Sequence, residues 1–213
     1  MRIVAIADTH LRHAKLDVPD GDVLVHAGDL LAHGTLDELA RATDWLRAMP
    51  HRTKVVVAGN HEVCLQRDRD RERARAMLDG FVYLEDAAAT IDGLVFWGSP
   101  WQPRFAFWAF GLARGPELAA KWALVPDRVD VLVTHGPPRG FGDRVRIFGS
   151  ERHVGDDDLL RRVREVRPRL HLFGHIHQDP GRWSESGNEN ESQTIFANVT
   201  TDDGTLPASI FDL

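Results

Sequence analysis

Residues 170–177 are Leu-His-Leu-Phe-Gly-His-Ile-His, a short apolar run that ends in a glycine and two histidines. Four earlier runs have the same form and also end in a polar cluster; they occupy residues 3–7, 23–26, 55–58 and 131–134. Short runs rich in Val, Ile and Leu, without polar alternation, are typical of strands buried on both faces. The sequence therefore predicts five such strands.

Helical stretches separate several of these runs. The spacing of apolar and charged residues predicts helices at residues 35–49, 67–78, 117–124 and 156–166. The first of them starts with Thr35 and has Glu38 three positions later, which is a capping-box pattern.

Further short strands are predicted at residues 81–84, 88–91, 94–97, 194–197 and 208–212, and a polar loop is predicted at residues 187–193. Asp92-Gly93 indicates a hairpin turn between two of these strands. Strands that alternate with helices, together with a block of strands in the middle, predict an α/β fold with two packed sheets. We expect a single domain over residues 1–213.

Composition and charge narrow the class of protein. The chain has 213 residues and a formal net charge of -6, so it has no general attraction to long nucleic acid or to an anionic membrane. Its one cysteine, Cys64, excludes an intrachain disulfide and fits a reducing compartment. The first apolar run is too short for a signal peptide or a membrane anchor. We therefore expect a cytoplasmic protein.

The polar clusters after the five buried runs contain the candidate site. They are Asp8-Thr9-His10, Gly28-Asp29, Gly59-Asn60-His61-Glu62, His135 and Gly174-His175-Ile176-His177. Ligand sites of α/β sheets form beyond the carboxyl ends of the strands, so these clusters are expected to converge. Carboxylate, amide and imidazole donors without thiolates suit Mn, Fe or Zn. They are more donors than one ion needs, and a carboxylate can bridge two ions about 3.5–4 Å apart.

Each cluster taken alone also has a purely structural explanation. Asp8-Thr9-His10 would serve as an ordinary turn, and His135 would serve as a hydrogen-bonded histidine of the core. The complete ordered set, with each member directly after a buried run, favours the metal site instead.

Two interpretations stay open for the residues that would contact a substrate. Residues 96–110 are unusually aromatic and include Trp101; they are either a loop folded over the edge of the core or a wall on which a nucleobase stacks. Arg104, Arg139 and Arg144 flank the expected site loops, where they either hold phosphate or are merely solvated.

The ordered set of motifs resembles the signature of the calcineurin-like metallophosphoesterases and spans residues 8–177. Within that superfamily the chain most resembles the metallophosphoesterase-domain-containing brain proteins and their bacterial relatives, through residues 98–103, 134–138 and 168–177. Both histidines of the last motif, His175 and His177, are present, which favours an active enzyme.

The resemblance implies a four-layer αββα sandwich of two mixed β-sheets flanked by helices. It implies two divalent transition-metal ions, with Mn²⁺ as the first choice and Fe or Zn as alternatives. One ion would be bound by Asp8, His10 and His177, the other by Asn60, His135 and His175, and Asp29 would bridge them. His61 would lie beside the scissile phosphate, with Glu62 as its partner.

As a mechanism we expect a metal-bridging hydroxide to attack phosphorus, and His61 either to stabilise the transition state or to protonate the leaving oxygen. The expected function is a phosphodiesterase acting on small nucleotides, cyclic ones included. The alternatives are a phosphomonoesterase or protein phosphatase, and a catalytically inactive binding scaffold. A scaffold would be expected to lack some of the metal ligands, and none is missing here.

Overall fold

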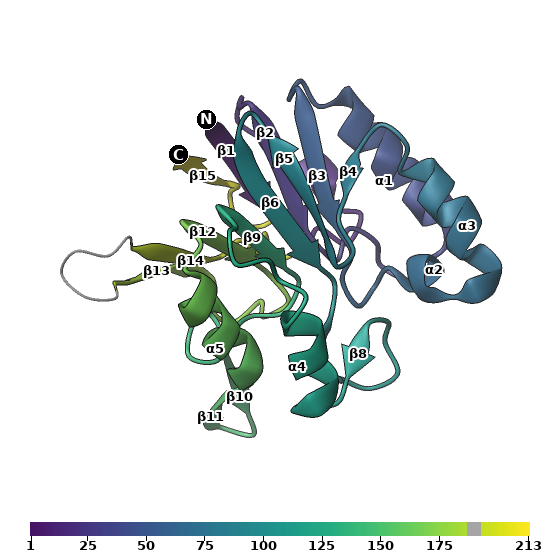
Figure 1. Ribbon diagram of the computed structural model, residues 1–213. Helices are drawn as coiled ribbons and strands as arrows, with labels where there is room; N and C mark the ends of the chain where they lie inside the picture. The colour runs from purple at the N-terminus through teal and green to yellow at the C-terminus, as the bar shows by residue number, and fades with distance from the viewer. Residues whose placement is uncertain (187–192) are drawn as a thin grey trace.

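The computed structural model describes residues 1–186 and 193–213 and contains two large mixed β-sheets. The first sheet has the strand order β15-β1-β2-β3-β4, with bounds Ser209–Asp212, Arg2–Ile6, Val23–Ala27, Thr53–Val57 and Val82–Tyr83. Strands β1 to β4 run parallel, and β15 pairs antiparallel with β1. This last pairing brings the two ends of the chain together (Figure 1).

The second sheet has the strand order β13-β14-β12-β9-β6-β5. The bounds are Gly181–Glu185, Thr194–Asn198, Leu170–Phe173, Val131–Thr134, Leu94–Ser99 and Ala87–Ile91. The four inner strands run parallel, and the two edge strands pair antiparallel with their neighbours. The carboxyl ends of β9 and β12 therefore lie at the same edge of this sheet.

Both faces of the inner strands β1, β2, β9 and β12 are buried, which explains the unbroken apolar runs in the sequence. In β1, Ile3 and Ala5 belong to the core between the two sheets, whereas Val4 and Ile6 belong to a second core beneath helices. Successive side chains of a strand point to opposite faces, so a strand covered on both sides needs apolar residues at every position. The prediction of five doubly buried strands is confirmed.

Helices cover the outer face of each sheet (Figure 1). The helices α1 (Leu36–Ala48), α2 (Val63–Gln66) and α3 (Asp68–Met77) contribute side chains to the core beneath the first sheet. The helices α4 (Pro116–Trp122) and α5 (Asp157–Val166) pack on the second sheet. The four-layer αββα arrangement expected from the sequence is thus confirmed.

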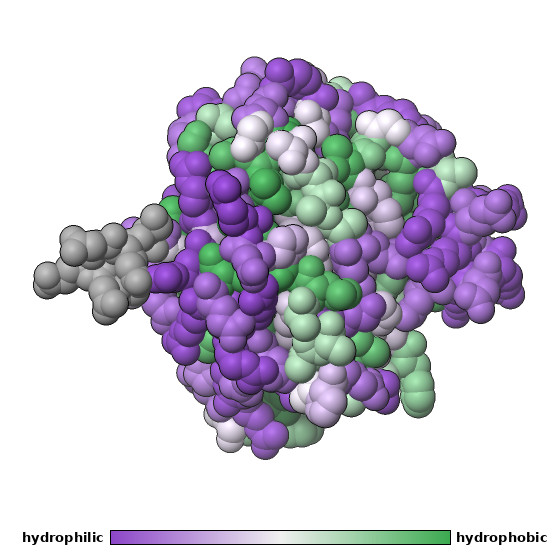
Figure 2. Space-filling view, viewed as in Figure 1, coloured by the Kyte–Doolittle hydropathy of each residue, from purple (hydrophilic) through white to green (hydrophobic). Residues whose placement is uncertain are grey.

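The ends of the helices agree with the capping signals in the sequence. Thr35 accepts a hydrogen bond from the backbone of Glu38, and Glu38 completes the capping box at the start of α1. Asp156 caps α5 by accepting the backbone N–H of Leu159 at 2.8 Å. Figure 2 shows the end of the molecule that carries α2 and α3 as hydrophilic, in keeping with the charged sequence of α3. Among the described residues, no helix combines the length and the apolar character that crossing a bilayer requires.

Several short elements were not predicted. They are η1 (His13–Lys15), β7 (Gln102–Pro103), β8 (Gly111–Leu112), β10 (Arg144–Ile147), β11 (Ser150–His153), and the helix α2 and strand β13 given above. The hairpin of β10 and β11 is mostly exposed and lacks the apolar pattern of a core strand. The loop predicted at residues 187–193 falls almost entirely on residues 187–192, which lie outside the described residues.

Candidate metal centre

The five polar clusters of the sequence meet at the carboxyl ends of the strands that precede them. Asp8 and His10 follow β1, Asp29 follows β2, Asn60 and His61 follow β3, His135 follows β9, and His175 and His177 follow β12. Three groups of these side chains each have ligand atoms within 4.8 Å of one another. The convergence expected from the strand pattern is therefore present.

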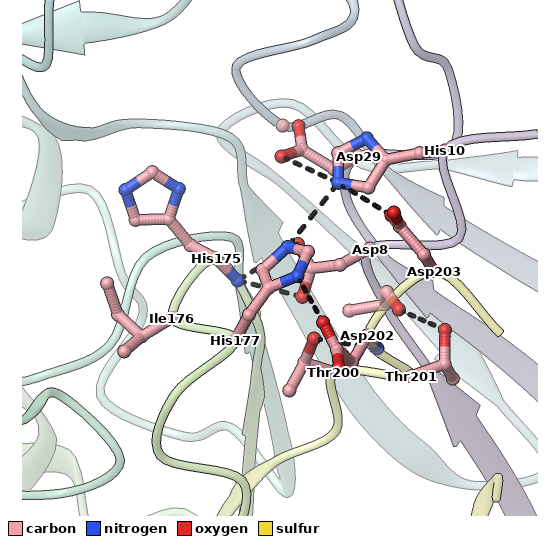
Figure 3. A network of polar contacts seen from close by, with 12 residues as sticks. Asp8, His10, Asp29, His175, Ile176, His177, Thr200, Thr201, Asp202 and Asp203 are labelled. Atoms are coloured by element: carbon pink, nitrogen blue, oxygen red, sulfur yellow. Dashed lines mark hydrogen bonds and ion pairs between the residues drawn. The ribbon is translucent and has the colours of Figure 1, made fainter. Parts of the chain in front are cut away.

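Asp8, His10 and His177 form the first group, in which side chains from opposite ends of the sequence face one another (Figure 3). The Nε2 atoms of His10 and His177 lie 3.4 Å apart. The Nε2 atom of His177 lies 3.9 Å from Oδ1 of Asp8. All three side chains offer donor atoms of the kind that divalent transition metals prefer.

Asp29, His135 and His175 form the second group. The Oδ2 atom of Asp29 lies 3.4 Å from Nε2 of His135, and Oδ1 of Asn60 lies 3.0 Å from the same nitrogen. Asp29 Oδ2 also lies 3.9 Å from Nε2 of His10, which belongs to the first group. Asp29 thus lies between the two groups, as a bridging ligand would.

Most of these histidines are oriented by an oxygen atom behind the ring. In His10, the Nδ1 atom lies 3.0 Å from the carbonyl oxygen of Leu31. In His135, the Nδ1 atom lies 3.1 Å from the carbonyl oxygen of Ala27. A carbonyl oxygen only accepts hydrogen bonds, so Nδ1 carries the proton in both rings. Nε2 is therefore the nitrogen of each ring that faces the centre, as in metal-binding histidines.

The backbone around the site adopts conformations that most residues avoid. Asp8, His10, Asp29 and His175 all have positive φ angles, between 41° and 70°. Such left-handed conformations cost energy, and they cluster at functional sites where the surrounding structure enforces them. At Gly174, a Cβ atom would come within 2.6 Å of Oδ2 of Asp8, so only glycine leaves room for this carboxylate.

Glu62 has a different place from the one we expected beside His61. It is buried, and its carboxylate accepts the backbone N–H groups of Asp29 and Leu31 at 2.9 Å and that of Gly59. Burial, with a further contribution from Asp29, raises the pKa of Glu62 to about 7. Nδ1 of His61 instead donates to the carbonyl of Ala32 at 2.6 Å. Glu62 therefore ties the loops after β2 and β3 together.

The buried charges at the centre control one another's protonation. Burial would raise the pKa of Asp29, but His135, His61 and His10 outweigh it and the pKa is lowered well below its usual range. Burial would lower the pKa of His135, but Asp29 and Asp8 raise it to about 9. A protonated imidazole thus balances the Asp29 carboxylate, and a divalent cation would take the place of that proton.

The chemistry of the donors fits two divalent transition-metal ions. Two carboxylates, one amide and four imidazoles converge, and the one cysteine lies elsewhere, buried in α2. Such a mixed oxygen and nitrogen set is typical of Mn, Fe and Zn sites and differs from the thiolate sets of structural zinc. Two acidic side chains as deeply buried as Asp8 and Asp29 also need a positive charge to balance them.

His61 lies at the edge of this centre and is covered by an aromatic ring. Its Nε2 atom lies 4.0 Å from Oδ2 of Asp29. The ring of Trp108, in the loop between β7 and β8, stacks on His61 with centroids 4.1 Å apart and planes inclined by 29°. The aromatic stretch 96–110 was expected to be either a loop over the core edge or a wall for a nucleobase, and neither interpretation predicted the stack of Trp108 on His61.

The four residues expected to contact substrate have different surroundings. Arg104 lines a pocket together with His175 and His177. Arg144 forms a two-pronged salt bridge with Asp179.

Trp101 and Arg139, like Arg144, are not among the residues that line that pocket. Trp101 donates from Nε1 to Asp86 at 2.9 Å, and its ring lies beneath the ammonium group of Lys121. Arg139 is exposed in the loop after β9, and its backbone N–H donates to Asp156. Arg104 is thus the residue of this set that lines the same pocket as His175 and His177.

Two aspartates that the sequence analysis did not select complete the polar network of Figure 3. Asp202 accepts a hydrogen bond from Nδ1 of His177 at 2.9 Å, and Asp203 Oδ1 lies 3.9 Å from Nε2 of His10. Both residues have positive φ angles and follow β14, beside the ends of β12 and β1. Their signal in the sequence was Asp-Asp-Gly shortly after a predicted strand.

Two buried strand histidines support the loops that carry the candidate ligands. Nε2 of His26 lies 3.0 Å from Oγ1 of Thr9, between Asp8 and His10 in the chain. Nε2 of His171 lies 2.9 Å from Oγ1 of Thr134. Burial lowers the pKa of both histidines to about 3, so both rings are neutral.

The sequence matches known proteins over most of its length. The family model for calcineurin-like phosphoesterases matches residues 1–179. Human metallophosphoesterase domain-containing protein 1 is 40% identical over 202 residues, which cover 84% of this chain and 61% of that protein. A UPF0046 protein of Caenorhabditis elegans is 39% identical over 211 residues, which cover 93% of this chain and 69% of that protein. The chain thus spans about three fifths of the human relative.

A solved structure has a similar fold at low sequence identity. Phosphopantetheinyl hydrolase from Mycobacterium tuberculosis superposes with a TM-score of 0.60 and 18% identity. The superposition covers 93% of this chain and 88% of that chain. This likeness supports the four-layer architecture described above.

Proposed function

This chain belongs to the calcineurin-like phosphoesterase family, and from that premise we propose that it is a metal-dependent hydrolase of small phosphodiesters. The ligands of its two cations would be Asp8, His10, Asp29, Asn60, His135, His175 and His177. Mn²⁺ is our first choice of metal, with Fe and Zn as alternatives, because the donors combine carboxylate, amide and imidazole.

The position of Asp29 is the observation that carries this proposal. Its Oδ2 atom lies within 3.9 Å of nitrogen atoms from both histidine groups. A single carboxylate between two sets of donors is what a pair of neighbouring cations needs. When bound, two such cations lower the pKa of water and neutralise charge on the phosphoryl oxygens.

The chain's own residues would orient the substrate and move a proton. Nδ1–H of His61 is fixed by the carbonyl of Ala32, so Nε2 faces the centre and can deliver a proton to the leaving oxygen. Trp108 holds the ring of His61 by stacking on it. A positioned general acid of this kind contributes about 10²–10⁴-fold to the rate.

Small nucleotides, cyclic ones included, are the first natural diesters to test. The net charge of -6 gives no broad attraction to long nucleic acid, so a small-molecule substrate fits better. The exposed part of Trp108 offers a flat aromatic surface beside His61.

The deciding experiment is a screen of the metal-reconstituted protein. Hydrolysis of bis-p-nitrophenyl phosphate, p-nitrophenyl phosphate and cyclic nucleotides is measured with Mn²⁺, Fe²⁺ and Zn²⁺. The proposal predicts faster turnover of the diester than of the monoester. A preference for p-nitrophenyl phosphate would contradict the phosphodiesterase proposal and indicate a phosphomonoesterase or protein phosphatase. No turnover with any metal would favour a binding scaffold.

A further inference from the structure

A pocket of about 530 Å³ adjoins the candidate metal centre. His175 and His177, which belong to the two candidate ligand groups, form part of its wall. Further walls come from the loop between β7 and β8, through Phe105, and from the β10–β11 hairpin, through Val145 and Ile147. A molecule whose phosphate lay at the histidines would therefore extend into this pocket.

The walls of this pocket are mostly apolar. Val145, Ile147, Val154 and Ile176 supply branched aliphatic side chains, and two prolines add to them. The polar lining side chains, besides the two histidines, come from arginine and glutamine, and no carboxylate occurs among the described lining residues. Small-molecule sites typically combine an apolar lining with a few polar groups in this way.

Part of the apolar lining is exposed to solvent in the absence of a ligand. Phe105 is 63% exposed and Ile147 is 41% exposed. Figure 2 shows apolar surface over the region that carries β8 in Figure 1. Covering such surface with an apolar group is favourable, because it removes the group and the wall from water.

The hairpin that forms one wall is fixed at its base. Arg114 donates from Nη1 to the carbonyl of Gly155 at 2.6 Å and from Nη2 to the carbonyl of Val154. Arg144 is held by the carboxylate of Asp179, which also accepts its backbone N–H at 3.0 Å. The wall is therefore formed before a ligand arrives, which reduces the ordering cost of binding.

We propose that this pocket binds an apolar group attached to one ester oxygen of the substrate. The inference rests on the proposed phosphodiesterase activity and shifts the preferred substrate from small nucleotides to diesters with an alkyl or aryl substituent. Recognition of a nucleobase uses hydrogen bonds to its edge and stacking on aromatic rings. Apart from the two histidines, Phe105 is the one aromatic side chain among the described lining residues, and Arg114 and Gln178 are already bonded to backbone groups. The polar base of a nucleotide therefore suits this pocket less well than an alkyl or aryl group of similar size.

Symmetric dialkyl phosphates test the inference, because either orientation presents the same chain to the pocket. Dissociation constants of dimethyl, dipropyl and dibutyl phosphate for the Mn²⁺-loaded protein are measured by isothermal titration calorimetry. Each buried methylene is worth about 0.8 kcal/mol, or roughly a fourfold change in affinity. Dibutyl phosphate is expected to bind at least about tenfold more tightly than dimethyl phosphate.

Two variants locate the effect. Ile147→Ser should flatten the dependence on chain length, whereas Leu124→Ser, at an exposed position outside the pocket, should retain it. Equal affinities along the series, or the same dependence in Ile147→Ser as in the unchanged protein, would overturn the inference. Hydrolysis of bis-p-nitrophenyl phosphate is measured in parallel. A protein that hydrolyses this diester but binds all three dialkyl phosphates equally would refute the proposed role of the pocket and leave the proposed function standing.

Discussion

Glu62 accepts a hydrogen bond from the backbone N–H of Asp29 at 2.9 Å, so a buried carboxylate after β3 fixes the residue after β2. The same carboxylate accepts the backbone N–H groups of Leu31 and Gly59. This arrangement gives Glu62 a positioning role, in which it holds two loops of the candidate centre in register.

Replacing Glu62 by alanine should therefore destabilise the protein. Three buried backbone donors would lose their acceptor, and each unsatisfied group costs about 1–3 kcal/mol. We expect the free energy of unfolding of the metal-free protein, from urea titration, to fall by about 3 kcal/mol or more. Glu165→Ala, at an exposed helix position, is the control and should change it by less than about 0.5 kcal/mol. Lost turnover with unchanged stability would show that Glu62 acts in the chemistry instead.

His61→Ala should reduce turnover of a phosphodiester by about 10²–10⁴-fold, the usual contribution of a general acid. The metal content should stay the same, because His61 is not among the proposed ligands. His33→Ala removes a largely exposed imidazole and serves as the control, with turnover unchanged. Steady-state kinetics with metal analysis of the same samples decide the matter. Full activity in His61→Ala would remove this residue from the mechanism.

Asp202→Ala should weaken one metal site more than the other. Asp202 accepts the Nδ1 proton of His177 and so orients the ring, and losing such a partner typically costs 10–100-fold in metal affinity. Titration of the metal-free protein with Mn²⁺, followed by the EPR signal of the free ion, resolves the two affinities. Asp212→Ala, near the end of the chain and exposed, is the control. Two unchanged affinities in Asp202→Ala would contradict the orienting role.

His171 should make the fold sensitive to acid. Its pKa is lowered by burial to about 3 in the folded protein, against about 6.5 when unfolded, so only the unfolded chain gains a proton as the pH falls below about 6.5. This residue therefore costs about 1.4 kcal/mol of stability for each pH unit below that value. Urea unfolding of metal-free protein at pH 7.5 and 5.5 should show His171→Gln losing less stability than the unchanged protein. Equal losses would contradict this assignment.

The sequence predicted that the candidate ligands converge, because their signal is local. Each one directly follows a doubly buried strand, as Asp29 follows β2 and His135 follows β9. Parallel strands bring their carboxyl ends to one edge of each sheet, and the packing of the two sheets brings the two edges together. The four longer helices had equally local signals, such as the capping box at Thr35.

The remaining features depend on contacts that no local pattern contains. The β10–β11 hairpin is largely exposed, so its strands lack apolar alternation. Arg144 was a candidate phosphate contact by position, but its salt bridge with Asp179 joins residues 35 positions apart. Asp202 lies next to His177 because β14 pairs with β12, and no local sequence pattern contains this pairing.

The number of ions bound per chain tests the central claim most directly. Protein reconstituted with Mn²⁺ and freed of excess metal is analysed by mass spectrometry for metal and protein content, beside an Asp29→Ala variant whose folding is checked by circular dichroism. We predict about two ions per chain in the unchanged protein, as in two-metal phosphoesterase sites, and a clear loss in the variant. An Asp29→Ala variant that retains both ions, or an unchanged protein that binds none, would contradict the account.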